Sequence, residues 1–180
     1  EIGSCDWSSD VCSSDLLQGN VFAAASHIGV VDVMNGINRI RLKTEQDYYN
    51  SGVMLMDLEA ARVLVQPEAI FQYVRDHENE LLLPDQDVFN SLYGAQTLQI
   101  DDALWNYDAR YYSGYLLRSG GAYHMDWVMQ HTAILHFCGK RKPWKRSYAT
   151  RFAPLYKHYR QLAARSGASF VSLSAPPSHG

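Results

Sequence analysis

An imidazole, a glycine and a group of cations stand close together in HFCGKRKPW, His136 to Trp144. An apolar run ends at His136, and an imidazole at a strand end can bind a metal ion. Gly139 permits a tight turn, and Lys142 can meet a pyrophosphate through charge-assisted hydrogen bonds. A lone histidine is more often a structural residue. His, Gly and Lys at this spacing before Pro and Trp nevertheless favour a binding site.

A second polar stretch, Tyr49-Asn50-Ser51-Gly52, precedes an apolar run. Asn50 and Ser51 offer neutral donors and acceptors where a predicted strand meets a loop. Gly52 permits the close approach of a ligand or of another backbone. The alternative is a turn that simply starts the strand, and these residues taken alone favour that alternative.

Two carboxylates flank an amide in Pro84-Asp85-Gln86-Asp87, at the predicted start of a helix. Asp85 can serve as the N-cap, because the helix dipole favours an acid there. The alternative is a polar cluster aimed into a cleft. The same residues form a DxD pattern, which can hold a divalent cation through two carboxylates. The positive end of a helix disfavours a cation, so we do not expect the metal site here.

Leu104-Trp105-Asn106-Tyr107 places an amide between two aromatic rings. Trp105 and Tyr107 can form a wall on which a sugar stacks, or they can pack in the core, which is the usual role of such residues. Core packing is therefore the default interpretation.

Short apolar runs alternate with amphipathic segments, which predicts an α/β fold. The predicted strands cover residues 21–26, 48–58, 97–100 and 133–137, and the predicted helices cover residues 58–65, 67–80, 85–93 and 154–165. Residues 32–43 are not expected to form a helix, because Gly36 and Asn38 interrupt them. Residues 108–123 are expected to be a long loop rich in Tyr, Gly and Ser.

The chain has 180 residues, enough for one domain, and 47% of them are hydrophobic. No apolar run is long enough for a membrane span, no secretory signal is visible, and no cysteines form a CxxC pair, which together favour a reduced, cytoplasmic setting. All 19 acidic residues lie at or before Asp126, whereas more than half of the 16 Lys and Arg lie from Lys140 to Arg165. This asymmetry indicates an anionic partner or a solvated basic helix.

Four stretches in this order, YNSGVMLMDL, LPDQDVFN, ALWNY and HFCGKRKPW, resemble family 8 glycosyltransferases. The resemblance runs from about Gln18 to about Trp144, and HxxGxxKPW is its most specific motif. It implies a GT-A fold, the Rossmann-like α/β fold of nucleotide-diphospho-sugar transferases. It also implies transfer of a hexose, with retention, from UDP-glucose or UDP-galactose to a glycan or lipid-linked acceptor, as in lipopolysaccharide or surface glycan biosynthesis.

The resemblance also implies a role for each matched residue. His136 matches the histidine that ligates a divalent cation, Mn²⁺ or Mg²⁺. The other matched residues are catalytic (Asp85 and Gln86), lie beside the donor sugar (Asn50, Ser51 and Gly52) or contact the diphosphate (Gly139 and Lys142). Because the Gln86 amide is a poor nucleophile, we expect same-face attack rather than a double displacement.

The first residues of the chain fit neither the fold nor the family. DWSSDVCSSDL, Asp6 to Leu16, repeats Ser-Ser-Asp and shows no helical or strand period. It resembles translated sequencing-adapter sequence, and it stands where the family's metal-binding DxD is expected. We therefore interpret residues 1–16 as non-native, residues 17–165 as a partial glycosyltransferase domain without its N-terminal nucleotide-binding half, and residues 166–180 as a disordered tail. The chain is then expected to be inactive alone. If the segment is a natural Ser/Asp loop, a non-catalytic sugar/diphosphate-binding module is the alternative.

The basic end of the chain mixes cations with aromatic residues from Lys145 to Arg165. Such a segment can lie on an anionic membrane surface, here on the inner face of the membrane, or it can be a packed helix with a wet basic face. No recognised nucleic-acid motif accompanies the charge, so nucleic acid is not an expected partner.

Overall fold

The computed structural model describes residues 17–26 and 33–166 of the chain. The chain forms two compact units, Glu1–His136 and Phe137–Gly180, and each is described by itself. The segment interpreted as non-native and the predicted C-terminal tail from residue 167 onward lie outside the described residues.

A three-stranded sheet lies at the centre of the first unit, in the order β2-β1-β3. Strand β1 (Phe22–Ser26) is buried along its whole length, as its small and apolar residues predict. It pairs antiparallel with β2 (Tyr49–Met56) and parallel with β3 (Thr97–Gln99), so all three predicted strands of this sheet are present.

Strand β2 is an edge strand, which corrects the prediction that it is buried. Only Tyr49 is buried, while Leu55 and Met56 are 44% and 36% exposed. The pairing with β1 also shifts register, since Ala24 pairs with Met54 but Ser26 pairs with Tyr49. The residues between Tyr49 and Met54 therefore have no one-to-one partners on β1.

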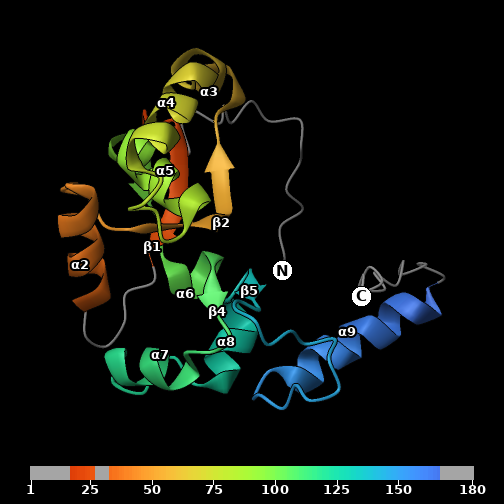
Figure 1. The fold of residues 1–180 in the computed structure, drawn as a ribbon. Helices are drawn as coiled ribbons and strands as arrows, with labels where there is room; N and C mark the ends of the chain where they lie inside the picture. Colours follow the sequence, from red (N-terminus) through yellow and green to blue (C-terminus); the bar gives the residue numbers. More distant parts are fainter. Residues whose placement is uncertain (1–16, 27–32, 167–180) are drawn as a thin grey trace, which may run out of the picture. The chain divides into compact units, whose positions relative to one another are not determined.

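Helices α3 (Leu58–Leu64), α4 (Pro67–His77) and α5 (Pro84–Tyr93) follow β2, close to their predicted bounds. Figure 1 shows α5 beside the sheet. The core between them is aromatic, with the ring of Phe22 5.3 Å from that of Phe89 and 5.8 Å from that of Tyr93. Phe71 of α4 is 62% exposed.

Residues 33–42 form a helix, α2 (Val33–Leu42), where the sequence predicts none. Tertiary contacts outweigh the low helix propensity of Gly36 and Asn38, which costs roughly 1 kcal/mol or less at each position. Arg41 reaches the buried carboxylate of Asp87, and Asn35 Oδ1 accepts a hydrogen bond from the backbone N–H of Tyr48.

The predicted loop at residues 108–123 also contains a helix, α7 (Tyr112–Arg118). It is held by Asp102 of α6 (Asp102–Trp105), whose carboxylate accepts hydrogen bonds from Tyr115 and Arg118. The Tyr115 ring stacks 4.0 Å from the buried ring of Tyr107. Tyr, Gly and Ser suggest a loop by composition, but one buried ring and one ion pair order this segment as a helix.

A second, two-stranded sheet completes the first unit. Strand β4 (Tyr107–Asp108) pairs parallel with β5 (Leu135–His136), and Asp108 lies opposite His136. Helix α8 (Met125–His131), which is not among the predicted helices, lies between them in the chain.

The second unit is built around Phe137 and helix α9 (Ala153–Arg165), which matches the predicted C-terminal helix. The Phe137 ring makes edge contacts with Tyr148 and Tyr156, and Phe152 is 1% exposed. On α9 itself, Tyr159 and Leu162 remain exposed. Within the described residues, no helix is both long enough and apolar enough to cross a membrane.

Candidate functional site

The start of β2 is fastened to α5 by one buried amide. The backbone N–H of Tyr49 donates to Asn90 Oδ1 at 2.7 Å, and Asn90 Nδ2 donates to the Tyr49 and Gln86 carbonyl oxygens, each at 2.8 Å. Asn90 is 3% exposed, so these bonds are shielded from water. This clamp brings the first turn of α5 next to the polar residues of β2.

The predicted side chains on these two elements contact one another. Ser51 Oγ donates to Asp85 Oδ2 at 3.1 Å, and Asn50 Nδ2 donates to Gln86 Oε1 at 3.2 Å. Asp85 is not the N-cap of α5, which is Leu83 without a side-chain cap bond. Its carboxylate is directed to Ser51 instead, which favours the polar-cluster interpretation over the capping one.

His136 joins this cluster through a residue that the sequence did not single out as a site residue. His136 Nδ1 lies 2.9 Å from Asn106 Oδ1, and Asn106 Nδ2 donates to Asn50 Oδ1 at 3.0 Å. Asn106 is fully buried and follows α6 directly, and its contact with His136 depends on the β4–β5 pair. The only sequence signal was its place between two aromatic residues. The sugar-wall interpretation is wrong for Tyr107, which is fully buried, whereas Trp105 is 47% exposed.

Gly52 leaves room for the imidazole. A Cβ at this position would lie 2.8 Å from His136 Cε1 and 3.0 Å from Asn50 Oδ1. Gly52 was expected to permit close approach of a ligand or backbone, but what approaches is a side chain of the same site. A side chain at position 52 would displace either His136 or Asn50.

Asp87 is directed away from the cluster and belongs to the structural framework. Its buried carboxylate accepts hydrogen bonds from Arg41, from the Tyr48 hydroxyl at 2.6 Å, and from the backbone N–H groups of Leu82 and Leu83. Burial would raise the pKa of Asp87, but these bonds outweigh it and lower the pKa to about 2. The carboxylate is therefore saturated with hydrogen-bond donors from the protein itself.

The two remaining predicted residues lie in the second unit. Gly139 has φ +79°, so the turn after β5 does need a glycine. Lys142 Nζ donates to the Phe137 carbonyl oxygen at 3.2 Å and lies 5.8 Å from the centre of the Trp144 ring. This geometry holds the ammonium group close to the turn.

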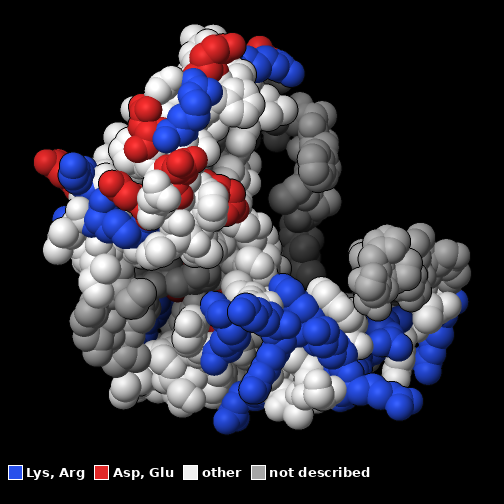
Figure 2. All heavy atoms as spheres, in the orientation of Figure 1, with Lys and Arg blue, Asp and Glu red and all other residues white. Residues whose placement is uncertain are grey.

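A cationic hollow of about 370 Å³ surrounds this turn, lined by Lys140, Arg141, Lys142, Lys145, Ser147 and Tyr148. Figure 2 shows Lys and Arg gathered over this part of the chain. No acidic residue occurs after Asp126 in the sequence, so the positive charge of the hollow is not offset within its own unit.

A divalent cation would find one candidate ligand here, the imidazole of His136. Its Nδ1 is engaged by Asn106, a second contact that commonly orients a ligating histidine. Over residues 17–26 and 33–166, however, no three His, Cys, Asp or Glu side chains gather as a metal site. The described residues thus fit one position of a coordination sphere and do not complete it.

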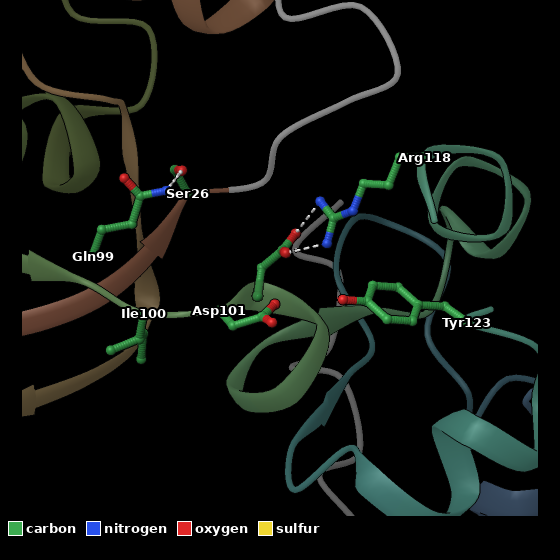
Figure 3. A pocket seen from close by; sticks show the side chains of 7 residues that line it. Ser26, Gln99, Ile100, Asp101, Arg118 and Tyr123 are labelled. Carbon is green, nitrogen blue, oxygen red and sulfur yellow. Dashed lines mark hydrogen bonds and ion pairs between the residues drawn. The ribbon is translucent and has the colours of Figure 1, made fainter. Parts of the chain in front are cut away.

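The first unit has another polar hollow that the sequence did not predict, at the ends of β1 and β3 (Figure 3). Its volume is about 510 Å³, and it is lined by Ser26, Gln99, Ile100, Asp101, Asp102, Arg118 and Tyr123. The Arg118–Asp102 ion pair spans it, and Gln99 Nε2 donates to Ser26 Oγ at 3.3 Å. Asp102 and Arg118 pair with each other, and Asp101 accepts a hydrogen bond from the backbone N–H of Ala103 at 2.8 Å. None of the predicted site residues lies in this hollow.

The mixed sheet, its helices and the polar cluster at the start of β2 define an α/β fold of the GT-A type. The crystal structure of galactosyltransferase LgtC, in complex with donor and acceptor sugar analogues, aligns with a TM-score of 0.60 and 20% identity, covering 96% of this chain and 56% of that one. The glycosyltransferase GlyE of Streptococcus pneumoniae TIGR4 aligns with a TM-score of 0.54 and 18% identity, covering 91% and 41%.

The sequence profile of glycosyl transferase family 8 matches residues 17–147, and the chain belongs to that family. A curated relative, general stress protein A of Bacillus subtilis (strain 168), is 30% identical over 118 residues, which are 62% of this chain and 40% of the relative. The chain therefore spans 40% to 56% of the length of these three proteins.

Proposed function

We propose that the cluster of Asn50, Ser51, Asp85 and Gln86 holds the hexose of a nucleotide-diphosphate sugar, UDP-glucose or UDP-galactose. The observation that carries the proposal is their hydrogen-bonded contact at one end of the sheet, between residues more than 30 positions apart in sequence. Neutral amides and one carboxylate offer the paired donors and acceptors that sugar hydroxyls require. The reaction proposed is hexosyl transfer, with retention, to a glycan or lipid-linked acceptor.

The reaction centre in this proposal is Asp85 and Gln86. The bond between sugar C1 and the diphosphate oxygen breaks, and the acceptor oxygen bonds to C1 on the same face while its proton passes to the departing diphosphate. Gln86 carries no charge and Asp85 is already hydrogen-bonded to Ser51, so both are suited to orienting the sugar rather than attacking it. Trapping of a sugar covalently bound to either residue would contradict this mechanism.

Gly139 and Lys142 are proposed to contact the diphosphate. The ammonium group next to a glycine turn supports this, because it supplies a fixed positive charge where negative charge develops. His136 is proposed as one ligand of Mn²⁺ or Mg²⁺, which when bound would neutralise diphosphate charge. Since the described residues do not complete that site, we expect the 180-residue chain to bind a donor but not to turn it over.

Lys145 to Arg165 is proposed to contact an anionic membrane surface. The exposed Trp144, Tyr159 and Leu162, together with the Lys and Arg residues of this segment, support this contact. Co-sedimentation with vesicles that shows no preference for anionic lipid would contradict it.

The test of the donor site is a calorimetric titration of the chain with UDP-glucose and UDP-galactose. We expect Gln86→Ala to weaken binding of the preferred donor by about tenfold or more, the value of one or two hydrogen bonds to the sugar. Gln72→Ala, an exposed amide on α4, is the matched control and should leave the affinity unchanged. Equal affinities for the two variants would contradict the site, and donor hydrolysis by the 180-residue chain would contradict its expected inactivity.

A further inference from the structure

One peptide group determines which way the side-chain amides of Asn50 and Asn106 are oriented, that is, where each places its oxygen and its nitrogen. The backbone N–H of Gly52 donates to Asn50 at 3.0 Å, and a peptide N–H can only donate. A side-chain amide has two orientations that differ by exchange of its nitrogen and oxygen, and the surrounding hydrogen bonds decide between them. Gly52 therefore requires that the Asn50 atom facing it is the oxygen Oδ1.

This requirement passes along the cluster from one amide to the next. With Oδ1 of Asn50 fixed, the group of Asn106 that faces it must be the donor Nδ2, at 3.0 Å. The oxygen of Asn106 then faces His136 Nδ1, at 2.9 Å. A carbonyl oxygen cannot donate, so the hydrogen of this last bond belongs to the imidazole.

We propose that the hydrogen-bond chain from Gly52 through Asn50 and Asn106 fixes neutral His136 in the Nδ1–H form and leaves its lone pair on Nε2. Asn106 is thereby a positioning residue for His136. The inference rests on the proposed function in one respect only, which is that the partner of Nε2 is a divalent cation. The hydrogen on Nδ1 itself follows from the hydrogen bonds that link Gly52, Asn50, Asn106 and His136.

The consequence for the site is that Nε2 is the acceptor nitrogen whenever the His136 ring is neutral. A neutral imidazole binds a cation, or accepts a proton, only through the nitrogen that carries no hydrogen. If both forms were equally populated, the apparent affinity for a partner at Nε2 would fall about twofold. Loss of the orienting contact as well commonly lowers metal affinity 10- to 100-fold. Gly52, Asn50 and Asn106 thus fix the acceptor nitrogen of His136 before any ligand binds.

The direct test is nitrogen NMR of the chain labelled with ¹⁵N, at about pH 9, where an ordinary histidine is neutral. Long-range ¹H–¹⁵N correlations distinguish a protonated ring nitrogen from an unprotonated one, and the His136→Gln variant identifies the His136 signals. We expect Nδ1 protonated and Nε2 unprotonated. Observation of the Nε2–H form in the unaltered chain would overturn the proposal. This test does not depend on the folding of any variant.

A matched pair of variants at Asn50 tests whether the hydrogen bonds leading to His136 determine its protonated nitrogen. In Asn50→Asp a carboxylate oxygen still accepts from Gly52 and Asn106, so the Nδ1–H form should persist. In Asn50→Ala the Asn106 amide loses its fixed direction, and the His136 signals should move to averaged shifts of both forms. Unchanged signals in Asn50→Ala would overturn the proposal.

Two controls separate this effect from others. Asn35→Ala removes a different buried amide that bonds the Tyr48 backbone, so it should lower stability and leave the His136 form unchanged. Addition of Mn²⁺ to the unaltered chain tests the proposed function instead. If the cation does not broaden the His136 signals while the Nδ1–H form is observed, the metal assignment fails and the inference about His136 stands.

Discussion

Asp87 offers the sharpest test of how this fold holds its site. Its side chain is fully buried and accepts hydrogen bonds at 2.7 Å and 2.9 Å from Arg41 as well as bonds from Tyr48 and two backbone N–H groups. Asp87→Asn keeps the shape but removes the charge and turns an NH₂ group toward these donors. Arg41, whose side chain is only 19% exposed, then loses its anion. We expect a loss of about 3 kcal/mol in the free energy of unfolding at pH 7, the low end for a broken buried pair, because Arg41 keeps some contact with water.

The dependence of stability on acid gives a second value for the contribution of the Asp87 carboxylate to the free energy of unfolding. The pKa of Asp87 falls from its ordinary value of 3.8 to about 2 in the folded chain, and at about 1.4 kcal/mol per pH unit this corresponds to about 2 kcal/mol of stability. Because the folded pKa is depressed, this stability is fully present above pH 3.8 and is lost as pH falls toward about 2. The unfolding free energies of the wild type and Asp87→Asn should therefore converge across that window.

Urea unfolding followed by circular dichroism, at pH 7 and at steps down to about pH 2, measures both quantities. Asp76→Asn, an exposed carboxylate on α4, is the control and should change the free energy by about 0.5 kcal/mol or less. A loss below about 1 kcal/mol for Asp87→Asn, or a difference from wild type that does not shrink in acid, would refute the reasoning.

Three further outcomes follow from single contacts. Gly52→Ala should displace His136 and lower the free energy of unfolding by about 1–3 kcal/mol. The shift of the His136 Cε1–H signal measures the displacement, and urea unfolding measures the stability. In the control Gly36→Ala, in α2, the added Cβ meets no atom within 4 Å, so this variant should be more stable by about 0.5–1 kcal/mol. Tyr115→Phe leaves Asp102 without the hydroxyl that donates to it at 2.8 Å and should cost about 1–3 kcal/mol, and an unchanged urea midpoint would argue against Asp102 as the anchor of α7. Lys142→Ala should weaken UDP binding by about tenfold or more in calorimetry, while the exposed Lys157→Ala should not, and equal losses would indicate a general charge effect.

The sequence predicts the elements that depend on local patterns and misses those that depend on distant partners. The strands around Phe22 and Thr97 and the helices α3, α4, α5 and α9 follow from apolar periodicity and Pro at the first turn. Helices α2 and α7 do not, because each depends on an ion pair to a buried carboxylate. No pattern within ten or fifteen residues carries that information.

The candidate site divides in the same way. The types of Asn50, Asp85, Gln86 and His136, and their order in the chain, could be recognised before any fold was known. That Asn106 joins two of them could not, because the contact spans 56 positions to Asn50 and 30 to His136 and exists only once β4 pairs with β5. The roles of these residues in binding and catalysis stay predictions for the experiments above.

The break in register between β1 and β2 bears on how such a site can diversify. Residues 50–53 lie between the paired positions Tyr49 and Met54, so no residue of β1 must match them one for one. Substitutions of Ser51 or Val53 can be absorbed there while the pairing of Met54, Leu55 and Met56 is kept, whereas Asn50 and Gly52 are constrained by their contacts within the cluster. The sheet thus separates the segment that faces the sugar in our proposal from the segment that maintains its own architecture. Sugar preference can evolve at this edge without a new fold.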